Sequence, residues 1–297
     1  MSFAEPVTDC ADAPAKINLT LRILGRRADG YHDIESLVAF ARIGDRLTFA
    51  RGAPLALHVH GPMAGGVGDT ADNLVLKAAR ALADRVHGLQ LGSFVLTKRL
   101  PVAAGVGGGS ADAAAALRLL ARANDIAPND PRLLAAARAT GADVPVCLDP
   151  RPRVMRGIGE ILSEPLDLPV LAMLLANPGV AVATKEVFAR FDRSAAEQGA
   201  APAIDPSAIP RAGDSLVDFL AMQTNDLERP ARELQAVTSD VLTALRALPN
   251  CQLARMSGSG ATCFAVFKSG EAARAGAERL RTAHPDWWIE ATTLGAG

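Results

Sequence analysis

The chain has 297 residues, a length that predicts one large domain or two medium-sized ones. Hydrophobic residues make up 49% of it, enough for a sizeable core, which excludes an intrinsically disordered protein. The formal net charge of −1, from 31 Lys plus Arg against 32 Asp plus Glu, lacks the basic excess that is typical of nucleic-acid-binding proteins. We therefore expect a globular protein that binds no nucleic acid.

The cysteines and the apolar segments indicate a cytoplasmic protein. The four cysteines are scattered without the CxxC spacing of a zinc site, and they are too few for a disulfide framework in a chain of this length. The first residues lack the basic and apolar regions of a signal peptide. The longest apolar run, 170–176, is too short to span a membrane.

The first third of the chain is predicted to be rich in strands. Alternating apolar and polar residues indicate a strand at 17–24, and an Asp-Gly turn signal and β-like stretches at 46–50 and 55–60 follow it. Apolar residues at helical spacing indicate a helix at 73–86. An apolar stretch at 94–98 indicates a further strand.

The middle of the chain begins with an alanine-rich segment that predicts a helix at 111–123. A second helix follows, with Asp130 as its N-cap, a proline in its first turn and Gly141 just past its end. Residues 144–148 are predicted to form a strand. Residues 192–213 contain few large apolar groups and many Ala, Pro and Ser, which predicts a mobile surface segment.

The last third of the chain alternates helices with strands. The predicted helices lie at 226–236, 238–247 and 271–283, and the predicted strands lie at 252–256, 262–267 and 287–293. Elements in this mixed order, without an internal repeat, predict an α+β fold rather than a regular βαβ repeat.

The most informative segment is a glycine-rich stretch at 101–110, directly before the predicted helix. Glycine removes side chains where a backbone must turn tightly or approach a ligand. We expect Ser110 to be the N-cap of the helix, whose free N–H groups and positive dipole end would bind phosphate oxygens. The alternative is a flexible connector that binds nothing.

Two common nucleotide-binding loops do not fit this stretch. A P-loop would need a lysine after the glycines, and none is present. The dinucleotide fingerprint would need a glycine where the chain has Ser110, and the chain does not begin with a regular βαβ unit. A dinucleotide-dependent oxidoreductase is therefore disfavoured.

Three segments resemble, in order, the three motifs of the GHMP kinase superfamily. Residues 13–32 resemble the first motif, 101–113 the second, glycine-rich one and 254–267 the third. Ala111 stands where a second serine is common and Val106 where leucine is common. Neither departure would remove a phosphate cradle that is built from backbone groups.

This resemblance implies a two-domain α+β fold. An N-terminal ATP-binding domain over 1–164 would resemble ribosomal protein S5 domain 2, and a ferredoxin-like α+β domain would cover 165–297, with the substrate cleft between the two. It also implies an ATP-dependent kinase that acts on an alcohol with the help of Mg²⁺. The oligomeric state, monomer or homodimer, stays open.

Three shorter segments are similar to one branch of the superfamily, which phosphorylates a cytidine-diphosphate-linked alcohol in isoprenoid biosynthesis. They are GRRADGYH at 25–32, GADVPV at 141–146 and NDLE at 225–228. The alternatives are a GHMP kinase for another alcohol, such as homoserine or mevalonate, and a catalytically inactive binding protein with the same fold. The presence of Lys16 and Asp143 argues against the inactive protein.

The resemblance assigns catalysis to Lys16 and Asp143. In phosphoryl transfer the carboxylate of Asp143 would orient the hydroxyl group and accept its proton late, while Lys16 would keep that carboxylate ionised. Ser110 would contact the phosphates or Mg²⁺, and Asp112 could favour the helix start or help to hold the metal. The expected ATP-binding residues are Pro101, Val102, Ala103, Ala104, Gly105, Val106, Gly107, Gly108, Gly109, Ser110 and Ala111.

For the acceptor, the resemblance assigns Tyr31 and Phe188 to the two faces of the cytosine base. His32 would hydrogen-bond to the edge of the base, and Asn18 and Thr184 would contribute further polar contacts. An ordinary core position is the alternative for Phe188.

Overall fold

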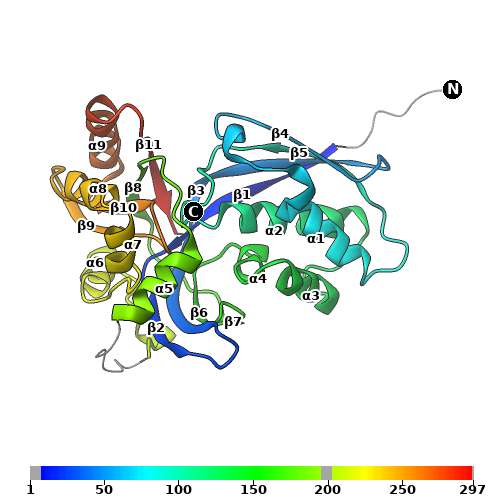
Figure 1. The fold of residues 1–297 in the computed structure, drawn as a ribbon, viewed down its shortest axis with the longest axis horizontal. Helices are drawn as coiled ribbons and strands as arrows, with labels where there is room; N and C mark the ends of the chain where they lie inside the picture. The colour runs from blue at the N-terminus through cyan, green and yellow to red at the C-terminus, as the bar shows by residue number, and fades with distance from the viewer. Residues whose placement is uncertain (1–7, 195–202, 296–297) are drawn as a thin grey trace. The chain divides into compact units, whose positions relative to one another are not determined.

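The computed structural model describes residues 8–194 and 203–295, which form two compact units (Figure 1). Unit 1 contains the chain up to Ala15 together with Gly44–Val102 and Gly107–Pro150. Unit 2 contains Lys16–Ile43, Ala103–Val106 and the chain from Arg151 onward. The expected boundary between residues 164 and 165 does not coincide with this division. It stays a prediction, because a compact unit and a family domain are different divisions of a chain.

The described residues of unit 1 form a small sheet and four α-helices. Residues 46–51 of β3 (His32–Arg51) pair antiparallel with β5 (Gly92–Thr97), which pairs parallel with β4 (Ala56–His60). β1 (Thr8–Asn18) also pairs with β3. The helices are α1 (Leu74–Ala83), α2 (Gly108–Ala123), α3 (Pro131–Thr140) and α4 (Val144–Leu148).

The helices of unit 1 begin where the local sequence provides a cap. The Asn73 side chain accepts a hydrogen bond from the N–H of Val75 at the start of α1, and Asp130 does the same for the N–H of Arg132 in α3. Gly141 follows α3. α2 presents a row of small, fully buried alanines, which lets neighbouring helices approach closely.

Unit 2 is built on an antiparallel sheet. Its strand order is β11 (Trp288–Leu294), β8 (Leu171–Asn177), β10 (Cys263–Phe267) and β9 (Cys251–Met256). β11 also meets β3 at Ala41. β3 belongs to unit 2 up to Ile43 and to unit 1 from Gly44 onward. Residues 32–38 of β3 pair with two further strands of this unit, β2 (Arg22–Arg26) and β6 (Arg153–Gly157), and β6 pairs with β7 (Ile161–Leu162).

Five α-helices complete the described part of unit 2, and four of them contribute buried side chains to one apolar core with its sheet. They are α5 (Thr184–Ser194), α6 (Gly213–Ala221), α7 (Glu228–Leu234), α8 (Val237–Arg246) and α9 (Gly270–Ala283). Among the described residues, no helix is long and apolar enough to cross a membrane.

Several sequence predictions about these elements are wrong. The strand predicted at 17–24 is split, because β1 ends at Asn18 and β2 begins at Arg22. Residues 144–148 form the short helix α4 instead of a strand. Pro145 lies in the first turn of α4, where a helix needs no N–H donor, so the proline is compatible with a helix start. The apolar composition of the segment by itself favours a strand.

Residues 195–202 of the predicted mobile surface segment at 192–213 lie outside the described residues, and among the others whose burial is described only two depart from a surface position. Ile204 and Ile209 are buried, and residues 206–208 form a 3₁₀ turn capped by Asp205. The described part after residue 202 is therefore packed against the protein, because these two side chains supply the apolar area that the rest of the composition lacks.

Candidate active site

Three segments that are far apart in the sequence meet in unit 2 through backbone hydrogen bonds. The N–H of Lys16, near the end of β1, donates to the carbonyl of Val106 at 2.9 Å. The N–H of Thr262 donates to the carbonyl of Ala104 at 3.1 Å. Residues 103–106 are thus held between β1 and the second glycine turn, which we define as residues 257–262.

The Ser257 hydroxyl joins the same three segments. It accepts a hydrogen bond from the Asn18 N–H at 3.0 Å and donates one to the Gly105 carbonyl at 2.9 Å. Gly105 lies so close to the second glycine turn that a Cβ on it would collide with the Ser257 carbonyl oxygen and would lie 2.8 Å from the Gly260 nitrogen. Gly105 is therefore needed for contact between two protein segments.

The second glycine turn is held in place by the 225–228 segment. The Asn225 side-chain amide donates to the carbonyls of Met256 and Gly258, both at 2.8 Å. The carboxylate of Glu228 accepts a hydrogen bond from the Met256 N–H at 3.1 Å. The NDLE sequence thus has a structural role, because it fixes the backbone on both sides of Ser257.

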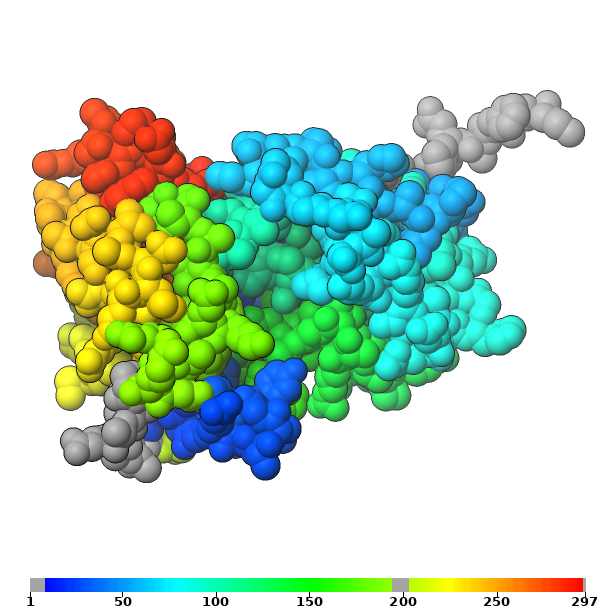
Figure 2. Space-filling model, in the orientation of Figure 1, coloured from blue at the N-terminus to red at the C-terminus, as the bar shows by residue number. Residues whose placement is uncertain are grey.

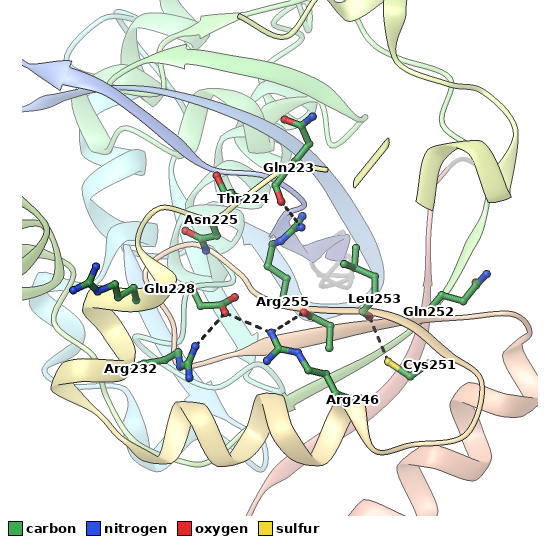
Figure 3. Close-up of a pocket in the computed structure, with 12 residues that line it drawn as sticks. Gln223, Thr224, Asn225, Glu228, Arg232, Arg246, Cys251, Gln252, Leu253 and Arg255 are labelled. Atoms are coloured by element: carbon green, nitrogen blue, oxygen red, sulfur yellow. Dashed lines mark hydrogen bonds and ion pairs between the residues drawn. The ribbon is translucent and has the colours of Figure 1, made fainter. Parts of the chain in front are cut away.

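Asn225 and Glu228 also line an open pocket of about 530 Å³, together with residues of β9. Figure 3 shows Glu228 between two arginines, with 3.9 Å to Arg232 and 3.7 Å to Arg246. The Arg255 guanidinium is buried and donates to three main-chain carbonyls, among them that of Gln223 at 2.6 Å. The arginines of this pocket therefore already have acceptors within the protein.

The glycine loop, defined as residues 101–111, runs through both units. Residues 101–102 and 107–111 belong to unit 1, and 103–106 belong to unit 2. The side chains of Ala104, Val106 and Ala111 are buried, whereas Val102 and Ala103 are exposed. For the buried members only backbone groups remain to meet a ligand.

The start of α2 differs from the sequence prediction. Its N-cap is Gly107, in a left-handed conformation with φ of 62°, and Ser110 lies in the first turn of the helix, where it is half-buried. Glycine adopts this φ without strain, so the helix can begin three residues earlier than its alanine-rich pattern suggests. The first-turn N–H groups have no acceptors within the helix and can bind an anion.

The two predicted catalytic residues belong to different units. Lys16 is 3% exposed and lies in the unit 2 part of β1, whereas Asp143 is the half-buried N-cap residue of α4 in unit 1. A lysine so deeply buried is costly unless other groups stabilise its charge. The joint role of the pair stays a prediction.

The predicted acceptor residues all belong to unit 2, and two of them are in contact. The rings of His32 and Phe188 are stacked, with centroids 4.7 Å apart and an angle of 24° between their planes. His32 Nε2 is hydrogen-bonded to the carboxylate of Asp192 at 2.6 Å. Figure 2 shows the blue hairpin of β2 and β3 at the surface, beside the yellow-green α5 that carries Phe188 and Asp192.

This contact differs from the arrangement that the sequence predicts, because the His32 ring covers one face of Phe188. Phe188 also packs partly against the apolar core of unit 2, so it has both a core contact and an accessible part. Tyr31, beside His32 in the chain, is 59% exposed. A base on the covered face of Phe188 would have to displace His32.

The two remaining acceptor residues lie next to the second glycine turn. Thr184 Oγ1 shares a hydrogen bond of 2.9 Å with the hydroxyl of Ser259, and the Asn18 amide donates to the Ser36 hydroxyl at 2.7 Å. Asn18 is buried, whereas Thr184 opens α5 and is exposed. The two side chains thus contact the same part of unit 2 that holds residues 103–106.

Comparison with known proteins identifies the family. The family model for the GHMP kinases N terminal domain matches residues 73–149, and the model for the GHMP kinases C terminal region matches 207–286. A protein of Rhodopseudomonas palustris (strain HaA2) is 57% identical over 295 residues, which cover 97% of this chain and 99% of that protein. The chain belongs to the GHMP kinases.

Two sequence relatives of this GHMP kinase and one solved structure carry names for the same enzyme. The Rhodopseudomonas protein and a protein of Bradyrhizobium sp. (strain ORS 278), which is 54% identical over 94% of this chain and 95% of that protein, are both called 4-diphosphocytidyl-2-C-methyl-D-erythritol kinase. A crystal structure of 4-(cytidine 5'-diphospho)-2C-methyl-D-erythritol kinase matches 97% of this chain and 100% of that chain, with a TM-score of 0.79 and 34% identity.

A more distant structure shows the fold alone. The L. major mevalonate kinase in complex with R-mevalonate has a TM-score of 0.71 over 99% of each chain, at 14% identity. The predictions of an α+β GHMP kinase fold and of a kinase activity are thereby confirmed.

The sequence prediction missed a buried charge cluster in unit 1 of this kinase. Lys98 Nζ lies 2.5 Å from Asp45 Oδ2 and 2.7 Å from Asp112 Oδ2, and all three residues are at most 3% exposed. Asp112 therefore faces Lys98, and the two roles considered for it from the sequence stay predictions. The one sequence signal was a lysine between the apolar strand at 94–97 and the glycine loop.

The cluster holds one ammonium group between two carboxyl groups. This excess of acidic groups affects the pKa values of its members. Burial raises the pKa of the Asp112 carboxyl to about 7, against the attraction of Lys98, and the negative charge of Asp45 adds to the rise. Burial alone would lower the pKa of Lys98, but the two carboxylates outweigh it and raise that pKa. Asp112 Oδ1 is buried and has no hydrogen-bond partner, which fits a carboxyl that holds a proton near neutral pH.

Proposed function

We propose that this GHMP kinase transfers the γ-phosphoryl group of ATP to the 2-hydroxyl of 4-diphosphocytidyl-2-C-methyl-D-erythritol. The products would be the 2-phosphate and ADP, in the non-mevalonate route to isoprenoid precursors. The observation that carries this proposal is the 57% identity with a protein of that name over 97% of the chain. Because both substrates are charged nucleotides, we also propose that the enzyme works in the cytoplasm, as a monomer or homodimer.

The phosphates of ATP would bind to backbone groups of the glycine loop and of the first turn of α2. The loop presents small or buried side chains, and the N–H groups at the helix start lack internal acceptors. Mg²⁺, when bound, would neutralise charge on the phosphate oxygens. Ser110 supports a metal there, because a half-buried hydroxyl in the first turn is an oxygen donor of the kind that Mg²⁺ accepts.

Among the described residues, no group of three or more His, Cys, Asp or Glu side chains could hold a metal ion. Mg²⁺ usually binds through one or two protein oxygens together with substrate phosphates. We therefore propose that the metal is bound together with ATP.

Asp143 would orient the acceptor hydroxyl and accept its proton as the bond to phosphorus forms. A carboxylate with a pKa of about 4 is too weak a base to remove that proton beforehand. Lys16 would balance the negative charge of the carboxylate and of the transferred phosphoryl group. The hydrogen bond from its N–H to Val106 supports this role, because it fixes the Lys16 backbone to the glycine loop.

The cytosine base would lie between Tyr31 and Phe188, with His32 at its edge. The stacked contact of His32 with Phe188 supports a shared site for the two residues. Asn18 and Thr184 would contact the polar part of the acceptor, because both lie next to the second glycine turn.

The experiment that tests this function is a coupled assay of ADP release with three acceptors at equal concentration. We expect turnover with 4-diphosphocytidyl-2-C-methyl-D-erythritol and at least about 10²-fold less with homoserine or mevalonate, because a site built for hydrogen bonds rejects ligands that cannot form them. Equal or better turnover with an acceptor that lacks the nucleotide would contradict the proposal and leave only the family.

A further inference from the structure

The buried cluster of Asp45, Lys98 and Asp112 lies between the two arms of the glycine loop within unit 1. Asp45 Oδ1 accepts hydrogen bonds from the N–H groups of Arg99 at 2.6 Å and Leu100 at 2.9 Å, directly before the loop. Asp112 belongs to α2, directly after the loop. Lys98 bonds to both carboxylates and so connects the two arms.

The backbone of Lys98 is fixed as well as its side chain. Its N–H donates to the carbonyl of His60 at 2.7 Å, and its carbonyl accepts from the N–H of Met63 at 3.1 Å. These bonds attach Lys98 to the end of β4. The ammonium group is therefore a fixed point in unit 1, around which the helix start can be placed.

The start of α2 lies directly against this ammonium group. A Cβ on Gly108 would lie 3.2 Å from Lys98 Nζ and 3.7 Å from Asp45 Oδ2. The position of the first-turn N–H groups therefore depends on where the ammonium group is held. Any displacement of Lys98 would move the groups that are available to bind phosphate.

We propose that Asp45, Lys98 and Asp112 are positioning residues for the phosphoryl donor, which hold the first turn of α2 at a fixed distance from residues 99–102. This inference rests on the proposed function, because it takes the phosphates of ATP as the ligand of the loop. The cluster itself does not contact the reacting atoms.

The chemistry of the cluster fits a positioning role better than a stabilising one. Replacing buried ion pairs with apolar groups of similar size is often neutral or stabilising, so burial of an ammonium group between two carboxyl groups is a poor way to gain stability. Short, directional hydrogen bonds to ionised groups do fix geometry, however. A cluster that set only the stability of unit 1 would not need to join both arms of the loop.

The first test uses Asp45→Asn, which keeps one oxygen for the N–H groups of Arg99 and Leu100 but turns an amide toward the Lys98 ammonium. We expect the KM for ATP to rise about tenfold, because a displacement of 1 Å can cost about 10²-fold in rate. The KM for the cytidine acceptor should stay within about twofold. The measurement is steady-state kinetics well below the unfolding temperature of each variant.

A second pair of variants keeps the test valid if Asp45→Asn fails to fold. Asp112→Ala removes one of the two carboxyl acceptors of Lys98, whereas Asp112→Asn keeps an oxygen that can accept a hydrogen bond from Lys98. Lys98 retains Asp45 in both. We expect a rise in the KM for ATP with Asp112→Ala and a clearly smaller rise with Asp112→Asn.

The matched control is Glu35→Gln in unit 2. The Glu35 carboxylate is fully buried and bonds to Arg22 at 3.2 Å and Arg156 at 2.9 Å, so its loss also disrupts a buried ionic cluster. It should lower stability and leave the KM for ATP unchanged. If Asp45→Asn and Asp112→Ala lower stability in the same way, with an unchanged KM for ATP, the positioning role is wrong. A wild-type protein without ATP-dependent turnover would instead refute the proposed function.

Discussion

At the scale of single residues, the absence of a side chain has a different physical consequence at each of the four glycines of the glycine loop. Gly105 allows two protein segments to touch, and Gly107 supplies a left-handed φ of 62°. Gly108 leaves room for the Lys98 ammonium group. Gly109 differs, because it is exposed and a Cβ there would meet only Leu74 Cδ1, at an ordinary 3.5 Å.

Gly109→Ala therefore tests the phosphate site without disturbing the fold. Alanine at this helical position should leave stability unchanged or raise it by up to about 1 kcal/mol, because alanine is the better helix former. The added methyl group should raise the KM for ATP about tenfold, since it would occupy space needed by the phosphates. Thermal unfolding and steady-state kinetics measure the two effects.

Gly213→Ala is the control for this variant, because Gly213 is the first residue of α6 and has no neighbour within 4 Å of an added Cβ. It should change neither KM. Unchanged ATP kinetics in Gly109→Ala would mean that phosphate does not approach the start of α2.

Asp112 should make stability depend on pH near neutrality. Its pKa is about 7 in the folded protein against an ordinary value of 3.8, so the folded state holds a proton that the unfolded state releases between these values. The stabilisation from this proton is fully present below about pH 4 and is lost as the pH rises through about 7.

Asp112→Asn removes this titration, so the two proteins should differ in their pH dependence. Between about pH 4 and pH 7 the wild-type free energy of unfolding should fall relative to that of Asp112→Asn, because only there does the folded state hold a proton that the unfolded state has released. Urea unfolding at several pH values in this range measures the difference. Parallel curves would show that Asp112 does not titrate there.

At the scale of elements, the second glycine turn depends on side chains from a separate segment of the chain, residues 225–228. Asn225 binds the carbonyls of Met256 and Gly258, and it also accepts from the N–H of Leu227. The position of the turn that carries Ser257 therefore depends on the position of the loop before α7.

Asn225→Asp should weaken this element, because a carboxylate cannot donate to two carbonyls and would repel them. We expect a loss of about 2–3 kcal/mol in the free energy of unfolding, since two buried acceptors lose their donor. Denaturant unfolding measures this value, and the rate of ATP turnover should fall with it.

Arg229→Ala, in the first turn of α7, provides the comparison for the loss of stability. Its side chain is 78% exposed and pairs with Glu233 at 3.0 Å, so its removal should cost at most about 0.5 kcal/mol. A similar loss in both variants would mean that the Asn225 hydrogen bonds add no stability.

At the scale of the whole molecule, the predicted catalytic groups come from both units. Asp143→Asn should abolish most turnover and retain ATP binding, because an amide cannot accept the proton of the acceptor hydroxyl. If Lys16 and Asp143 act together, the variant with both Lys16→Ala and Asp143→Asn should lose far less than the sum of the single losses. Additive losses in kcat would show that the two residues act independently.

Local sequence determined much about this protein, because caps and motifs act over a few residues. The caps of α3 at Asp130 and Gly141 are predicted correctly from the chain alone, and the helices predicted at 73–86 and 271–283 are found at 74–83 and 270–283. The family follows from these motifs, since spacing along the chain is what they record.

The tertiary structure alone decided which residues meet across long separations. Ser257 bonds to Asn18 over 239 positions, and Lys98 bonds to Asp45 over 53, and no local periodicity encodes such pairs. The different roles of Gly105, Gly108 and Gly109 also follow only from the tertiary structure. A glycine in the sequence does not indicate which atoms a side chain at that position would contact. Hydrogen bonds and close contacts are satisfied in space, so their partners are fixed only when the chain is folded.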